Sequence, residues 1–135
     1  MIESAEEFVY LRNSEVIEEY ERAANEEASL DTWQEVILRY PEMKKWVAHN
    51  KTVPLEILSI LATDSDRDVR WVVATKRKLS KELQLQLAKD CDEGVRNRIA
   101  YNAKAYKEPL ELLANDNSES TKKKAIERLK SGEYR

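Results

Sequence analysis

The chain has 135 residues, enough to bury one hydrophobic core without a metal or a disulfide, and its 26 acidic and 23 basic side chains give a net charge of −3. Two glycines and three prolines among abundant Glu, Lys, Leu and Ala predict an all-α protein and argue against the all-β class. The single cysteine, Cys91, excludes an internal disulfide framework. No apolar run is long enough for a signal peptide or a membrane span, so we expect a cytoplasmic protein.

The small net charge conceals an asymmetry along the chain. Residues 1–40 contain 11 acidic and 3 basic side chains, a net charge of −8, whereas residues 41–135 contain 15 and 20, a net charge of +5. Such charges are often only the solvated faces of helices. The alternative is that one end of the molecule meets a basic partner, or the other end an acidic one.

The first predicted helix spans residues 5–12. Ser4 and Glu7 have the spacing of a capping box, in which the serine caps the helix and the glutamate reaches back to the backbone of the cap. Ser14 is expected to cap a second, more acidic helix that ends near residue 24 and carries an apolar stripe of Val16, Ile17 and Tyr20. We expect Phe8 and Tyr20 to seal the open end of the repeats that follow.

Two further helices are predicted over residues 32–40 and 41–48. Ser29 or Asp31 caps the former, and Trp33, Val36 and Ile37 face inward. Proline favours the first helical position, so Pro41 opens the latter. Asn50 stands where the helix over residues 41–48 ends, and Asn102 recurs two 26-residue periods later. We expect each to be a left-handed C-cap residue.

A unit of 26 residues repeats from about residue 41 to residue 129. Its clearest copies are Leu61-Ala62-Thr63-Asp64, Leu87-Ala88-Lys89-Asp90 and Leu113-Ala114-Asn115-Asp116. The predicted N-caps of the repeat helices are Asp66, Ser80, Asp92 and Ser118. Such a period is typical of stacked repeats, in which each unit buries its apolar face against its neighbours, so Leu61, Leu87 and Leu113 should be buried equivalently. In the last helix Thr121, Lys124 and Ala125 replace the apolar positions, which we interpret as a polar end of the array.

The pattern predicts a right-handed stack of about nine or ten short helices. We expect a single α-solenoid domain over residues 1–135, with residues 1–40 as an acidic helical cap and residues 41–130 as about 3.5 repeats.

The residues from Val47 to Arg70 carry a family resemblance. They read Val-Ala-x-Asn-x-x-x-Pro and then Leu-x-x-Leu-Ala-x-Asp-x-Asp-x-x-Val-Arg, which resembles the leucine-rich repeat variant, a relative of HEAT repeats. The resemblance covers about residues 41–129 and implies a curved α-solenoid of short paired helices. The original member of that family carries an iron–sulphur module held by a cysteine cluster. With Cys91 alone, this chain is not expected to hold that cofactor.

The sequence offers no catalytic constellation. His49 is the only histidine, and no motif places a nucleophile beside it. Cys91 stands between two aspartates, which disfavour a thiolate. Asp64, Asp66 and Asp68 alternate like the start of a calcium loop, but the glycine of such a loop is missing, so we expect Asp66 to be an N-cap. We therefore expect no enzyme activity, no cofactor and no metal.

Two charged registers recur with the repeat. The basic one contains Lys44, Arg70, Arg96 and Lys122, and the acidic one contains Asp64, Asp90 and Asp116. In one interpretation each arginine reaches the aspartate of its own or a neighbouring turn, which makes a ladder that fixes repeat geometry. In the other, the basic register is free and forms a stripe for an acidic protein or a phosphate backbone.

Trp71 lies about 150° around its helix from the apolar positions, at 100° per residue, so it should be at least partly exposed. It either covers the groove between adjacent repeats or forms part of a binding hot spot. Tyr101 falls on the same side in the next unit, and we expect Trp71 to lie near Arg96. The predicted partner-binding residues are Lys45, Arg70, Trp71, Arg96 and Tyr101.

The sequence favours a non-enzymatic module that binds another protein on the concave face of a solenoid. A specific version is an intracellular immunity or adaptor protein that blocks a basic toxin or enzyme. The alternative is a HEAT-like protein that binds nucleic acid on a basic concave stripe, against which the acidic N-terminal segment counts. We expect no membrane partner.

Overall fold

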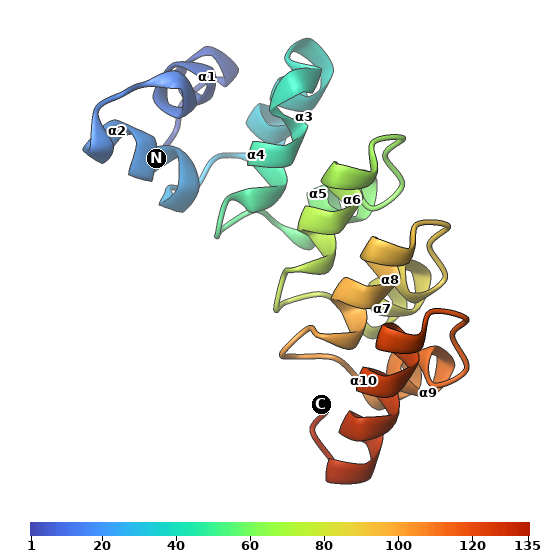
Figure 1. The fold of residues 1–135 in the computed structure, drawn as a ribbon. Coiled ribbons are helices and arrows are strands. Elements are labelled where there is room, and N and C mark those ends of the chain that lie inside the picture. The colour runs from blue at the N-terminus through green and yellow to red at the C-terminus, as the bar shows by residue number, and fades with distance from the viewer. The chain divides into compact units, whose positions relative to one another are not determined.

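The computed structural model describes residues 1–135 as an all-α protein of ten short helices and one 3₁₀ turn (Figure 1). In chain order the helices are α1 (Ala5–Asn13), α2 (Ile17–Asn25), α3 (Leu30–Arg39), η1 (Pro41–Met43), α4 (Lys44–His49), α5 (Leu55–Leu61), α6 (Arg67–Ala74), α7 (Lys81–Ala88), α8 (Glu93–Ala100), α9 (Lys107–Leu113) and α10 (Glu119–Ser131). The predicted class and number of helices are confirmed. The one strand-like feature is an isolated bridge between Ile2 and Ala28.

The helices pack in successive pairs, such as α1 with α2, α3 with α4, α7 with α8 and α9 with α10. The chain forms two compact units, residues 1–61 (the N-terminal unit) and residues 62–135 (the C-terminal unit). The single domain with a boundary at residue 40 stays a prediction. None of the ten helices combines the length and the apolar character that a membrane span requires.

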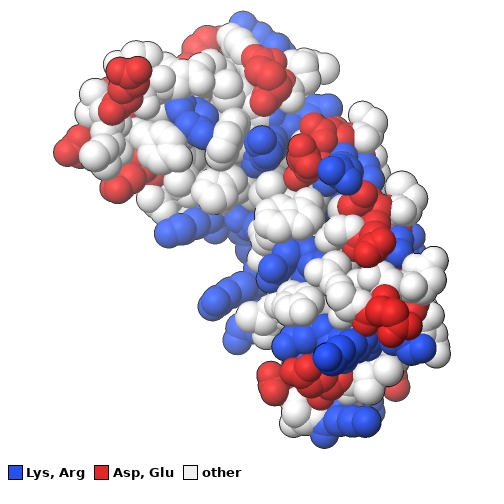
Figure 2. Space-filling view, in the orientation of Figure 1, with Lys and Arg blue, Asp and Glu red and all other residues white.

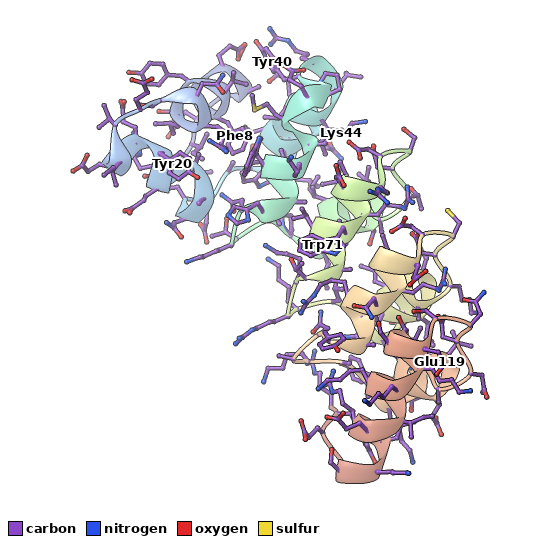
Figure 3. All side chains as sticks on the ribbon, in the orientation of Figure 1. Phe8, Tyr20, Tyr40, Lys44, Trp71 and Glu119 are labelled. Atoms are coloured by element: carbon purple, nitrogen blue, oxygen red, sulfur yellow. The ribbon has the colours of Figure 1, made fainter.

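The core of the N-terminal unit is built around two aromatic rings. Phe8 points from α1 toward α3 (Figure 3), where its ring meets that of Trp33 edge to face, with 5.2 Å between the centroids. Both side chains are fully buried, and the indole Nε1 of Trp33 has no hydrogen-bond acceptor. The aliphatic side chains buried in the same unit are Ile2, Leu11, Val36, Val47, Val53, Ile57, Leu58 and Leu61.

Two predictions about the first helices need correction. Ser4 caps α1 as expected, since its Oγ accepts from the amide of Glu7, but the Glu7 carboxylate accepts from the amide of Glu3 instead of closing the box on Ser4. Ser14 does not cap α2. Its Oγ accepts from the amide of Val16 two residues on, which makes a local turn before the helix.

The apolar stripe on α2 is also exposed rather than buried. Val16, Ile17 and Tyr20 are 51%, 68% and 45% exposed, and Ala23 is the only buried side chain of the helix. The stripe has the α-helical period, but no other helix of the N-terminal unit covers it, so its side chains stay exposed. Of the two residues expected to seal the repeats, only Phe8 is buried.

The C-terminal unit contains α6 to α10 in two rows. Helix α8 contacts α6 on one side and α10 on the other, and α7 contacts α9. Asp66, Ser80 and Asp92 cap α6, α7 and α8 with their side chains, as predicted. Ser118 stands at the N-cap of α10, but its hydroxyl donates to Glu93 and makes no cap hydrogen bond.

Leucines at the repeat spacing are buried as predicted, at 0% exposed for Leu61 and 1% each for Leu87 and Leu113. The expected polar end of the array is wrong, because Thr121 and Ala125 on α10 are fully buried. Helix α10 ends at Gly132, whose φ of 75° is a left-handed conformation that favours glycine.

The predicted left-handed C-caps at Asn50 and Asn102 are wrong, since no residue other than glycine has a positive φ. Both asparagines are instead buried clamps on the preceding helix pair. The side-chain amide of Asn50 donates to the carbonyls of Ala23 and Glu26 at 2.8 and 3.0 Å, and that of Asn102 donates to those of Ala74 and Lys76 at 2.8 and 2.9 Å. Each clamp therefore satisfies carbonyls that a helix end leaves without a partner.

Arg128 makes the same clamp one period after Asn102. Its Nη1 donates to the carbonyls of Ala100 and Asn102 at 2.8 and 2.7 Å, which lie 28 and 26 residues earlier. Asn102 likewise reaches 28 and 26 residues back. The clamps tie each helix pair of the C-terminal unit to the preceding pair by buried hydrogen bonds.

Candidate functional site

The turns that precede α6, α8 and α10 share one backbone arrangement. In each turn an aspartate carboxylate accepts from the amide two residues on: Asp64 from Asp66 at 3.0 Å, Asp90 from Asp92 at 2.8 Å and Asp116 from Ser118 at 3.0 Å. Aspartate favours this local hydrogen bond, which holds the chain in a tight turn before the helix starts. Acidic side chains gather along this edge of the C-terminal unit in Figure 2.

Arg70 on α6 is held by the turn of the next repeat. Its Nε and Nη2 donate to the two carboxylate oxygens of Asp90 at 2.8 and 3.2 Å, and its Nη1 donates to the carbonyl of Asp64 at 2.8 Å. The side chains of Arg70 and Asp90 are only 11% and 8% exposed. The hydrogen bond to Asp90 raises the pKa of the guanidinium. Little of Arg70 is available to a partner in this conformation.

Arg96 on α8 repeats this arrangement with the following turn. Its Nε donates to the Asp116 carboxylate at 2.9 Å, and its Nη1 donates to the carbonyl of Asp90 at 2.9 Å. Asp90 therefore joins the two arginines, accepting from Arg70 with its side chain and from Arg96 with its backbone. The ladder interpretation describes both arginines, and the free basic stripe does not.

Trp71 lies beside Arg70 on α6 and points outward (Figure 3), with 44% of its surface exposed, in agreement with its predicted position. It lines an open groove of about 310 Å³ together with Arg67, Asp68, Asp92 and Gly94. Arg67 Nη1 contacts the Asp92 carboxylate at 3.2 Å across this groove. A β-carbon at Gly94 would lie 3.0 Å from the Asp92 carboxylate, so glycine avoids a close contact with this side chain.

Tyr101, the residue after α8, lines a different pocket. It is 46% exposed, and the ammonium of Lys124 lies 5.1 Å from the centroid of its ring. The groove at Trp71 and the pocket at Tyr101 have no residue in common, and Arg96 lines neither of them. Trp71 and Tyr101 therefore line different pockets, and their common binding of a partner stays a prediction.

Lys45 belongs to the N-terminal unit, where it is exposed and its ammonium lies 5.2 Å from the ring centroid of Trp46. The guanidinium of Arg12 lies over two aromatic rings, those of Trp46 and Tyr20. Its carbon is 3.4 Å from the Trp46 ring centroid and 4.7 Å from the Tyr20 ring centroid. This cation–π cluster was not predictable from the sequence, because Arg12 and Trp46 lie far apart in the chain. Such contacts stabilise a desolvated guanidinium.

Comparisons with protein-family models, with curated proteins and with solved structures give no match. The resemblance to the leucine-rich repeat variant thus rests on the repeated residues alone. Any functional conclusion has to come from the geometry of the sites.

The described residues contain no group of three His, Cys, Asp or Glu side chains placed to hold a metal ion. Asp66, expected as an N-cap rather than a calcium ligand, accepts from the amide of Asp68 at 2.8 Å and caps α6. Cys91 is an exposed free thiol whose sulfur lies 3.8 Å from Nη2 of Arg70.

A further pocket of the C-terminal unit, with a volume of about 610 Å³, was not predicted from the sequence. Its basic lining residues are Lys104, Lys124, Arg128 and Arg135. One signal was present in the sequence, because Arg128 stands at the repeat position of Asn50 and Asn102. At this position Arg128 is longer than asparagine and carries a charge.

Proposed function

We propose that the protein is a non-enzymatic module that binds another protein, and that its helix pairs form a short α-solenoid of the HEAT-like kind. The 26-residue period supports the solenoid, together with the two rows of helices in the C-terminal unit. In such an array the inner helices present recurring side chains to a partner.

The observation that carries the proposal is Trp71. A tryptophan that is 44% exposed and lines a groove with Arg67 has the composition of a binding hot spot. Arg70, which precedes Trp71, and Arg96, one repeat later, both bind Asp90 and hold the repeats together.

The test compares capture of partners from the native host by the wild type and by Trp71→Ala. Leu112→Ala is the matched control, because Leu112 is also a half-exposed apolar residue of the C-terminal unit, 40% exposed, and lies outside the groove. We expect Trp71→Ala to weaken binding of the captured partner by about 2 kcal/mol, roughly 30-fold, with unchanged thermal stability. Loss of stability with intact affinity per folded molecule would identify Trp71 as packing between repeats.

A narrower version of the proposal is an immunity or adaptor protein that inhibits a basic toxin or enzyme. The N-terminal unit supports it, since residues 1–61 contain 13 acidic and 6 basic side chains, a net charge of −7. A basic partner would associate faster at low salt. An association rate for the captured partner that does not depend on salt would argue against this version.

Nucleic-acid binding is the second candidate, favoured by three exposed basic side chains in the α6–α7 and α8–α9 loops, Arg77, Lys78 and Lys104. Phosphate contacts by such residues give affinity that falls steeply with salt. Micromolar, salt-sensitive binding to a random duplex would promote this candidate. No binding at low salt would remove it.

A further inference from the structure

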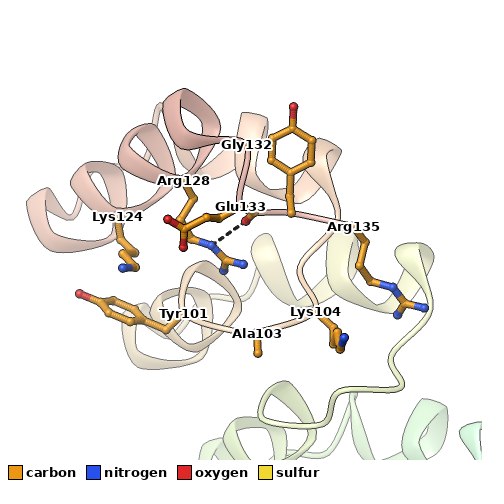
Figure 4. A pocket seen from close by; sticks show the side chains of 9 residues that line it. Tyr101, Ala103, Lys104, Lys124, Arg128, Gly132, Glu133 and Arg135 are labelled. Atoms are coloured by element: carbon orange, nitrogen blue, oxygen red, sulfur yellow. Dashed lines mark hydrogen bonds between the residues drawn. The ribbon is translucent and has the colours of Figure 1, made fainter.

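The pocket of about 610 Å³ in the C-terminal unit lies between the α8–α9 loop, helix α10 and residues 132–135 (Figure 4). Its charged lining side chains are Lys104, Lys124, Arg128, Glu133 and Arg135, with a net charge of +3. Tyr101 forms one wall, on the side of Lys124. The pocket shares no residue with the groove at Trp71.

Arg128 provides the most specific feature of this pocket. Its side chain comes from α10 and is 6% exposed as a residue, and burial lowers the pKa of the guanidinium. Nη1 donates to the carbonyls of Ala100 and Asn102, and Nε donates to that of Glu133 at 3.0 Å (Figure 4). These bonds fix the plane of the guanidinium and use three of its five N–H groups.

The two remaining N–H groups of Arg128, both on Nη2, have no hydrogen-bond acceptor among the protein's atoms. Nη2 is not one of the buried polar atoms that lack a partner, so its two N–H groups face the solvent in the pocket, where a ligand can reach them. The clamp alone explains Nη1 and not Nη2, because Asn102 makes the equivalent clamp with an uncharged amide. The guanidinium faces one carboxylate, that of Glu133, and its solvent-facing edge suits an anionic ligand.

The other cations extend the same site. Lys124 stands one turn before Arg128 on α10, and its ammonium lies 3.4 Å from Glu127 and 5.1 Å from the Tyr101 ring. Lys104 enters from the α8–α9 loop, where Gln84 and Asn102 bind its backbone at 3.0 and 2.8 Å and fix its position. The one carboxylate, that of Glu133, accepts from the Ser131 hydroxyl at 3.0 Å.

We propose that this pocket binds a phosphate monoester. A phosphate carries a charge near −2 and three terminal oxygens. It suits a preoriented guanidinium edge with two N–H groups, together with Lys124 from the same helix and Lys104 from the α8–α9 loop. A carboxylate supplies one charge and two oxygens, which Arg128 alone would satisfy. The remaining volume and the Tyr101 ring accommodate the group that carries the phosphate, from either a phosphorylated small molecule or a phosphorylated side chain of a protein.

The probe for the test is inorganic phosphate, titrated into the full chain at constant ionic strength while backbone amide shifts are followed by NMR. We expect saturable shifts confined to the α8–α9 loop, the second half of α10 and residues 132–135, with half-saturation below about 5 mM. Lys124→Gln should weaken binding by about fivefold or more. Lys130→Gln removes an exposed charge of the same helix that does not line the pocket, and it should leave binding unchanged.

Three results would overturn the proposal. They are the absence of saturable shifts up to about 20 mM phosphate, equal weakening by Lys124→Gln and Lys130→Gln, and equally strong binding of glutamate. Arg128→Met also removes the clamp, so Lys104→Gln serves as the second pocket variant and should weaken binding without unfolding. Tighter binding of glycerol phosphate than of a phosphoserine peptide assigns the small-molecule source, and the reverse order assigns the protein source.

Discussion

Asp90 is the residue whose replacement tests the ladder most directly. The change Asp90→Ala removes three hydrogen bonds made by its carboxylate, two from Arg70 and one from the amide of Asp92. It also leaves the Arg70 guanidinium, 11% exposed, without a carboxylate and with only carbonyl oxygens and the Cys91 sulfur as acceptors. Charge-assisted hydrogen bonds contribute about 1.5–3 kcal/mol each, and removal of one partner from a buried pair costs about 3–5 kcal/mol.

Arg70 retains its bonds to the carbonyls of Asp64 and Ser65, so we expect Asp90→Ala to lower the free energy of unfolding by about 3 kcal/mol. The assay is urea unfolding at neutral pH, with a double-mutant cycle of Arg70→Ala and Asp90→Ala that isolates the pair. Its coupling energy should be about 2 kcal/mol or more.

The control is the ion pair of Arg67 and Asp92, whose side chains are 71% and 21% exposed. Water and salt screen such a pair, so its coupling energy should be about 0–1 kcal/mol. Equal coupling energies for the two pairs would refute the argument that burial makes the ladder a determinant of stability.

Three further predictions follow from burial and charge. Leu87→Ala should lower the free energy of unfolding by about 3–4 kcal/mol, because Leu87 is 1% exposed and a cavity adds to the lost transfer energy. In the same urea assay, Leu112→Ala at a 40% exposed site should lower it by less than about 1 kcal/mol. Asn102→Ala should lower the free energy of unfolding by about 2–3 kcal/mol, since it leaves one buried and one part-buried carbonyl without a donor. Hydrogen exchange should quicken at the end of α6. The hydrogen bond from Arg22 lowers the pKa of Glu26 below 4.5, so this carboxylate stabilises the fold above that pH and stops doing so as the pH falls through its folded pKa. Acid unfolding of Glu26→Gln should then show a weaker dependence on pH below 4.5, and an unchanged profile would exclude this contribution.

Features that depend on neighbouring residues were predictable from the sequence. The caps at Ser4, Asp66, Ser80 and Asp92 are local hydrogen bonds between a side chain and an amide two or three residues on, so their spacing suffices to find them. The same holds for the buried leucines, because a fixed period requires equivalent environments.

Features that depend on a distant segment were not predictable. The stripe on α2 has the period of a buried face, yet Ile17 is 68% exposed, because amphipathicity does not say whether a second helix covers it. Asn102 was expected to adopt a left-handed backbone, whereas its side chain binds carbonyls 28 and 26 residues away. The same limit applies to Trp71. Its angle around α6 predicted that it is exposed, but not which groove it lines.

The clamps at Asn102 and Arg128 have a consequence for how this chain can change in length. Each side chain binds carbonyls 28 and 26 residues earlier, so gain or loss of one residue within a repeat would move the donor off its acceptors. Gain or loss of a whole 26-residue block restores every donor to an equivalent acceptor. Recombination between repeats is thus tolerated only in complete steps, and natural length variants of this protein should differ by multiples of one period.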